Sequence, residues 1–154
     1  MRVIVPPDPL LLATEERSIF LAGSIAMGNA EPWQEALIEA LRSFDVVILN
    51  PRRPAWDASW VQSIANPTFR EQVEWELAAQ ELATLVVMYF APSTQAPITL
   101  LELGLLARSG KLIVCCPEGF WRKGNVDVVC ARLGVEQVDS LDALARAALR
   151  RLTP

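Results

Sequence analysis

The sequence predicts one α/β domain in which helices cover both faces of a mostly parallel sheet. Short apolar runs alternate with segments of helical periodicity along the 154 residues. The apolar runs are continuous stretches of Val, Ile and Leu without an alternating polar face, which is typical of strands buried on both sides. Because no repeat, low-complexity tract or linker divides the chain, we expect residues 1–154 to form a single domain.

The apolar runs predict about five strands. The first, SIFLAG, ends at a glycine, and the second, DVVILN, is stopped by a proline. The last is a short strand that we expect at the edge of the sheet. The predicted strands are residues 18–23, 45–50, 85–90, 111–116 and 136–138.

Helices are predicted between these strands, with recognisable start and stop signals. Pro32 suits the first turn of a helix, Gly110 follows the end of the third helix, and Ser140 can cap the last. The predicted helices are residues 32–43, 68–83, 97–109, 122–133 and a C-terminal segment that starts after Ser140.

The composition excludes several classes of function. The formal net charge of −4 argues against a protein that coats nucleic acid, which would have a basic face. The absence of histidine excludes His-based triads, His zinc sites and His general bases. The three cysteines form no CxxC, so they indicate reduced thiols, and no apolar run approaches the roughly 20 residues that span a bilayer. We therefore expect a cytoplasmic protein without a membrane partner.

In a doubly wound fold, ligands bind beyond the carboxyl ends of the strands. The first strand runs into Gly23 and Ser24, small residues that let backbone N–H groups approach an anion or a sugar. Gly23 and Gly28 have GxxxxG spacing, but Asn29 and Ala30 replace the Lys and Ser/Thr of a P-loop, so the nucleoside triphosphate motif is absent. The alternative is a tight strand-to-helix turn without a ligand.

Glu102 is the most informative residue because its helical neighbours Ile98, Leu105 and Leu106 are apolar. A carboxylate buried there without partners would cost several kcal/mol, so it either faces a cleft or is paired. Glu76 lies near the apolar stripe of the preceding helix and can form the second carboxylate of a pair, as in glycosidic chemistry. The alternatives are a structural ion pair or an exposed edge position for Glu102 and a boundary position on an amphipathic helix for Glu76.

The loop 50–67 leaves the end of the second strand and can cover the site. It carries Arg52, Arg53 and Asp57 together with two tryptophans, Trp56 and Trp60. Arginine can hold a phosphate or a carboxylate, and tryptophan can stack on a nucleobase. The alternative is that these side chains only anchor the loop or form a subunit contact.

Several segments together resemble a known family. IFLAGSI and LLELGLLARSGKLIV resemble the nucleoside 2-deoxyribosyltransferase superfamily, which also contains 2′-deoxynucleoside 5′-monophosphate N-hydrolases. NPRRPAWD, FREQVEWEL, PITLLELG and CCPEGFWRKGN resemble, more narrowly, its nucleoside 2-deoxyribosyltransferase-like branch. The resemblance extends over roughly residues 18–133.

The resemblance implies a flavodoxin-like fold and a double displacement on N-glycosides that needs no metal or redox cofactor. The nucleophile of the family is the Glu of its ELG motif, here Glu102, and Glu76 matches the family acid that contacts the sugar. Gly23 and Ser24 match the turn that lines the site, and Asn125 matches an asparagine that a neighbouring subunit sometimes supplies. A homodimer or a larger homo-oligomer is therefore expected.

The chain departs from the family pattern at positions that decide the substrate. Phe20 stands where transferases often have Tyr, and Ala26 where monophosphate hydrolases tend to have Arg. Arg52 and Arg53 then become the best remaining contacts for a phosphate. We expect N-glycosidic bond cleavage or base exchange on a (deoxy)nucleoside or nucleotide. The alternatives are a nucleotide-binding sensor without turnover and a hydrolase acting on another N-glycoside such as NAD.

Overall fold

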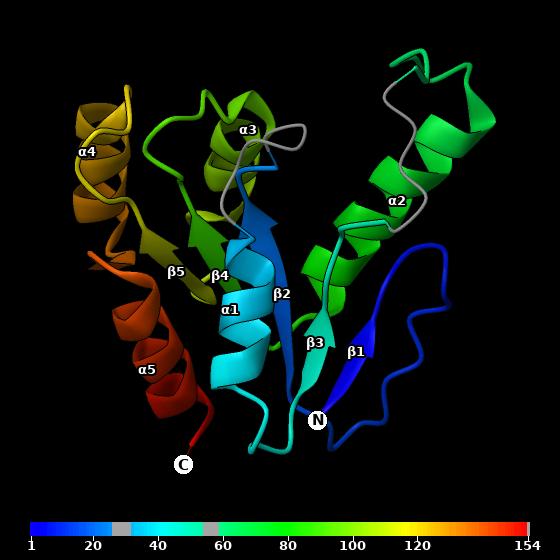
Figure 1. The fold of residues 1–154 in the computed structure, drawn as a ribbon, viewed down its shortest axis with the longest axis horizontal. Coiled ribbons are helices and arrows are strands. Elements are labelled where there is room, and N and C mark those ends of the chain that lie inside the picture. Colours follow the sequence, from blue (N-terminus) through cyan, green and yellow to red (C-terminus); the bar gives the residue numbers. More distant parts are fainter. Residues whose placement is uncertain (26–31, 54–58, 154) are drawn as a thin grey trace.

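The computed structural model describes residues 1–25, 32–53 and 59–153, which form six strands and five helices (Figure 1). None of these helices is both long and apolar enough to cross a membrane. The strands are β1 (Arg2–Ile4), β2 (Ser18–Gly23), β3 (Val47–Leu49), β4 (Leu85–Tyr89), β5 (Leu112–Cys115) and β6 (Glu136–Val138). The helices are α1 (Trp33–Ala40), α2 (Pro67–Leu82), α3 (Pro97–Leu106), α4 (Lys123–Leu133) and α5 (Leu141–Leu152).

All neighbouring strands are parallel, in the order β1-β3-β2-β4-β5-β6. Without β1 this is the strand order of flavodoxin-like folds, with the chain reversing direction between β2 and β4. The predicted α/β class and the five predicted strands are confirmed. β1 was missed because only one of its three residues, Ile4, is buried, and a short exposed edge strand shows no sequence pattern.

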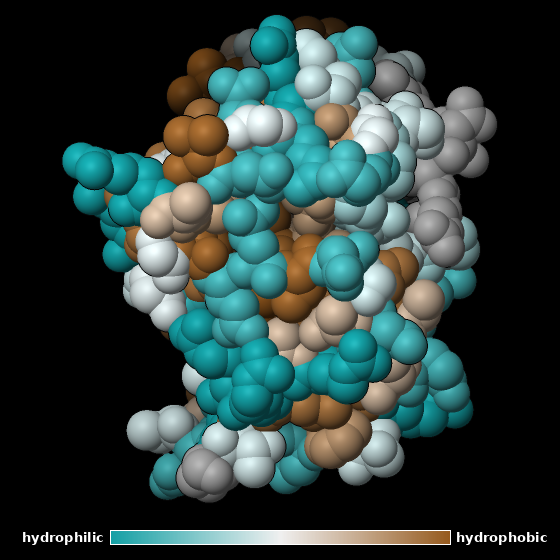
Figure 2. All heavy atoms as spheres, turned by 90° about the vertical axis from the view of Figure 1, so that its left-hand side faces the viewer, coloured by the Kyte–Doolittle hydropathy of each residue, from teal (hydrophilic) through white to brown (hydrophobic). Residues whose placement is uncertain are grey.

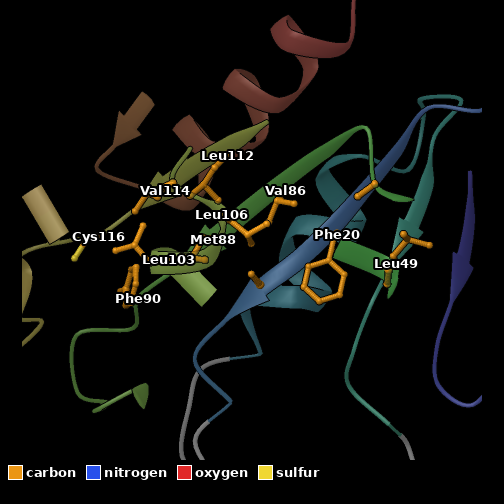
Figure 3. Close-up of a cluster of buried hydrophobic side chains, with 14 of the residues drawn as sticks. Phe20, Leu49, Val86, Met88, Phe90, Leu103, Leu106, Leu112, Val114 and Cys116 are labelled. Atoms are coloured by element: carbon orange, nitrogen blue, oxygen red, sulfur yellow. The ribbon is translucent and has the colours of Figure 1, made fainter. Parts of the chain in front are cut away.

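The sheet lies between two helical layers (Figure 1). Neighbouring residues of β2 point to opposite faces: Phe20 joins the core under α2, α3 and α4, and Leu21 joins the core under α1 and α5. Both faces of the strand are therefore buried, which explains its continuous apolar run. Figure 3 shows Leu103 and Leu106 of α3 among side chains of β4 and β5, which fixes how α3 lies on the sheet.

Polar and charged side chains of β6 contact the helices on either side of this edge of the sheet. Glu136 is paired with Arg150 of α5, and Gln137 donates a hydrogen bond to Asp127 of α4 at 2.9 Å. Figure 2 shows this side of the molecule, where hydrophilic side chains cover much of the surface between smaller hydrophobic patches. Charges on an edge strand discourage pairing with another sheet.

Candidate active site

α2 and α3 bring the two predicted carboxylates, Glu76 and Glu102, within electrostatic reach of each other. α2 starts at a clear signal, because the Asn66 side chain accepts hydrogen bonds from the first-turn N–H groups of Thr68 and Phe69. α3 packs on the sheet through Leu103 and Leu106, and Glu102, with only 9% of its surface exposed, is turned away from solvent. Among the described residues, Glu102 is the one buried charged residue.

The pKa of Glu102 is raised to about 7. Burial is the main cause, the negative charge of Glu76 adds to it, and the hydrogen bond from Gln80 acts in the opposite direction. Burial likewise raises the pKa of Glu76, and a hydrogen bond from Gln72 partly offsets it. Near neutral pH the carboxyl of Glu102 therefore exchanges between protonated and ionised forms.

Each carboxylate receives a hydrogen bond from a buried glutamine of α2. Gln80 Nε2 donates to Glu102 Oε1, and Gln72 Nε2 donates to Glu76 Oε1 at 2.8 Å. The same Gln72 nitrogen donates to the Pro51 carbonyl at 2.9 Å, which ties α2 to the end of β3. Sequence reasoning missed both glutamines. The signal was their spacing, since residues 72, 76 and 80 are four apart and share one helical face.

Gly23 ends β2 at the point where strand order reverses, between β2 and β4. Its φ is 154°, and an added Cβ would lie 2.6 Å from both the Trp33 ring and the Tyr89 carbonyl oxygen. The turn therefore needs glycine so that α1 can approach the sheet closely.

Ser24 is buried, and its polar groups are engaged within the protein. Its Oγ accepts from the Ala91 N–H at 3.1 Å, and its hydroxyl is hydrogen-bonded to that of Thr94 at 2.7 Å. These bonds join the turn after β2 to the loop that leads into α3. The strand-to-helix turn considered for this segment thus has a structural role, and a substrate contact of Ser24 stays a prediction.

The adjacent arginines after β3 point to different helices. Arg53 forms an ion pair with Glu71 of α2 at 3.1 Å and lies over the Trp60 ring, with 14% of its side chain exposed. Arg52 is half exposed, and its Nη1 lies 3.9 Å from a carboxylate oxygen of Glu35 on α1. Arg53 is therefore held in place, whereas Arg52 has the more accessible guanidinium.

One predicted site residue, Asn125, lies away from the carboxylate pair. Asn125 is exposed on the first turn of α4, on the opposite side of α3 from α2 (Figure 1). Asp57 lies outside the described residues. Their roles in substrate binding stay predictions.

Other chemistry-bearing groups lie away from the pair. A hollow of about 520 Å³ is lined by Arg70, Glu71 and their neighbours, and one of about 580 Å³ by Lys123, Asp127 and their neighbours; neither is lined by Glu76 or Glu102. The cysteines are free and buried, and burial raises the pKa of Cys115 to about 12, so that thiol stays protonated. No group of three or more acidic or cysteine side chains in the described ranges could hold a metal ion.

A comparison with protein families matches the part of the chain that carries these residues. The family model described as "Nucleoside 2-deoxyribosyltransferase like" matches residues 16–120, more than half of the chain. The match includes both carboxylates, both glutamines and the turn after β2. The search of curated proteins found no match. The chain therefore belongs to the nucleoside 2-deoxyribosyltransferase-like family.

Proposed function

We propose that this protein cleaves or exchanges the N-glycosidic bond of a (deoxy)nucleoside or nucleotide through a covalent intermediate on Glu102. The observation that carries the proposal is a buried carboxylate, Glu102, paired with a second carboxylate, Glu76, and held by an amide. The match to a nucleoside 2-deoxyribosyltransferase-like family supports a nucleoside or nucleotide as the substrate class. The buried, unpaired cysteines fit a cytoplasmic protein.

In the proposed reaction, ionised Glu102 attacks the anomeric carbon, the C–N bond breaks, and the base leaves with the bonding electrons and takes up a proton. Glu76 accepts hydrogen bonds from sugar hydroxyls. Water or a second base then displaces Glu102, loses a proton and releases the sugar with net retention. Because the pKa of Glu102 is about 7, turnover should decline as the pH falls below 7 and the nucleophile becomes protonated.

The proposal is tested by incubating the protein with deoxynucleosides, deoxynucleoside monophosphates and NAD, with and without free adenine, and measuring released and exchanged base by chromatography. Glu102→Ala should lower turnover by several orders of magnitude. Glu74→Gln is the matched control, since Glu74 is an exposed carboxylate of α2 paired with Arg70.

A folded Glu102→Ala protein that keeps most of the activity would contradict the role of Glu102. Binding of a nucleotide without any released base would favour the sensor alternative. Base released from NAD and from none of the other substrates would favour the alternative of a hydrolase that acts on NAD. A nucleoside fluorinated at C2′ should slow breakdown of the glycosyl ester, so intact-mass measurement should find the adduct on the wild type and not on Glu102→Ala.

We also propose that the protein is a homo-oligomer that associates through α2 and α3. Large apolar side chains are exposed on the helices that carry the two carboxylates. Leu101 and Leu105 of α3 are 61% and 60% exposed, and Leu77 of α2 is 43% exposed. Exposed apolar side chains that cluster on neighbouring helices are typical of protein interfaces.

Light scattering tests the proposed oligomer. The wild type should be at least a dimer at micromolar concentration, and Leu101→Asp should produce the 17.0 kDa monomer. Val128→Asp is the control, because Val128 is 69% exposed on α4 and lies outside the proposed surface. A monomeric wild type would refute the proposal.

A further inference from the structure

Two residues, Gln80 and Lys111, connect the end of α2 to the helix that carries Glu102. Gln80 is 3% exposed, and its amide donates to Glu102 although the two residues are 22 positions apart. Two residues later α2 ends at Leu82, and its last carbonyl groups have no partners within the helix. What holds this last turn therefore also determines where the Gln80 amide lies.

Lys111 supplies the partners that the end of α2 lacks. Its Nζ donates to the carbonyl oxygens of Gln80, Glu81 and Ala83 at 2.7, 2.8 and 3.2 Å, which uses all three N–H donors of an ammonium group. The last turn of α2 contains no basic residue of its own. A cation at this end of a helix is also favoured by the helix dipole.

The same lysine is attached to the end of α3. Its backbone N–H donates to Ser109 Oγ at 3.3 Å, and the Ser109 hydroxyl donates to the carbonyl of Leu106, the last residue of α3, at 2.7 Å. Its carbonyl accepts from the Val86 N–H at 2.7 Å, which fixes Lys111 on the sheet. Lys111 thus joins the carboxyl ends of the two helices that carry the carboxylate pair.

We propose that Lys111 and Gln80 are positioning residues: Lys111 fixes the last turn of α2 so that the Gln80 amide holds one oxygen of the Glu102 carboxylate and leaves the other free. The consequence for catalysis depends on the proposed function, whereas the effect on the Glu102 carboxyl does not. Within the described residues, Glu76 is the ionisable group that acts on Glu102, and Gln80 is the neutral donor that favours its charged form.

The experiment follows the Glu102 carboxyl by carbon NMR during a pH titration of glutamate-labelled protein, with Glu102→Gln used to assign the signal. Gln80→Leu removes the donor and should raise the titration midpoint by about 1 pH unit. Lys111→Met should also raise the titration midpoint of Glu102. Lys111→Arg should keep the midpoint at the wild-type value, because a guanidinium can also donate to several carbonyls. Where a nucleoside is turned over, the acidic limb of the kcat profile should move with the midpoint.

Two controls separate positioning from general loss of stability. Lys123→Met changes the chain's only other lysine, which pairs with Asp127 on α4. Leu144→Ala weakens the core under α5. Neither should move the Glu102 midpoint. If Gln80→Leu leaves the midpoint unchanged, or if Lys111→Met shifts it no more than Leu144→Ala does, the proposal is wrong. If Lys111→Met does not fold, the titration midpoints of Gln80→Leu and Lys111→Arg decide whether the proposal holds. Because the titration needs no substrate, a protein without turnover would contradict the proposed function and not this inference.

Discussion

The helices on the two faces of the sheet bury different kinds of side chain. α1 and α5 contribute Trp33, Leu37 and Leu144 to an apolar core, and Gln34 is the one polar residue that these two helices bury. On the other face, α2 and α3 bury four polar side chains, which are Gln72, Gln80, Thr99 and Glu102.

The difference assigns separate tasks to the two faces. Apolar side chains gain free energy when they leave water, so the α1–α5 face stabilises the fold. Burial of an ionisable carboxyl costs free energy and raises its pKa. The buried carboxyl on the α2–α3 face therefore lowers the stability of the fold. Replacing the buried carboxyl of α3 and replacing a buried apolar side chain of α1 or α5 should therefore act in opposite directions on stability.

The largest effect is expected at Trp33, which is fully buried, lies 5.5 Å from the Tyr89 ring and donates to the Ser24 carbonyl. Trp33→Ala should lower the free energy of unfolding by about 3–5 kcal/mol, because it leaves a large cavity between α1 and the sheet. Urea denaturation measures this loss. The control is Leu82→Ala on the other face, where 53% of the side chain is exposed, with an expected loss below about 1 kcal/mol. Equal losses would contradict the division of tasks.

The second effect has the opposite sign and depends on pH. The pKa of Glu102 is about 7 in the folded protein and 4.5 as its ordinary value, so the folded state binds the proton more tightly. Between these pH values the wild type loses stability as the pH rises, because ionisation is easier in the unfolded chain. Glu102→Gln does not ionise and can still accept the Gln80 hydrogen bond. It should match the wild type near pH 4.5 and exceed it by up to about 3 kcal/mol at pH 8.

Chemical denaturation across this pH range measures the difference between Glu102→Gln and the wild type. Glu74→Gln, on an exposed and ion-paired carboxylate of α2, should show no such growth with pH. A Glu102→Gln protein that is less stable than the wild type at pH 8 would mean that burial of this carboxyl has no cost.

The smallest expected effect concerns the boundary between the two faces, where Arg52 points to α1 and Arg53 to α2. We expect the exposed Arg52 guanidinium to contact a substrate phosphate by a charge-assisted hydrogen bond. Arg52→Ala should weaken binding of a nucleoside monophosphate by about ten- to a hundred-fold and leave nucleoside binding nearly unchanged. Titration calorimetry with both ligands measures this.

Arg53→Ala is the matched comparison for Arg52→Ala. Because Arg53 is occupied by Glu71 and Trp60, its loss should change binding of the nucleoside and of the nucleotide alike. Absence of a preference for nucleotide in the wild type, or its survival in Arg52→Ala, would rule out the phosphate contact.

Much of the fold could be predicted from the sequence because the relevant physics is local. The run SIFLAG has apolar side chains on both faces, so it predicts a strand that is covered on both sides. In the structure Phe20 and Leu21 lie in the two separate cores. Glu102 was identified for the same reason, since a carboxyl among leucines is costly unless it has a function or a partner. β1 was missed because an exposed strand of three residues carries no such constraint.

The partners of Glu102 were decided by the tertiary structure. In the sequence, Gln80 and Lys111 look like ordinary polar residues. Gln80 contacts Glu102, 22 positions away, and Lys111 contacts the Gln80 carbonyl at the end of α2, 31 positions away. Those contacts exist because parallel strands must be joined by long crossover connections. The connection that leads into β4 contains α2, the connection that leads into β5 contains α3, and the two helices therefore lie side by side. Local pattern thus determined which residues must be buried. The packing of the crossover helices determined which buried polar groups meet, because hydrogen-bond partners depend on atomic positions that hydropathy does not encode.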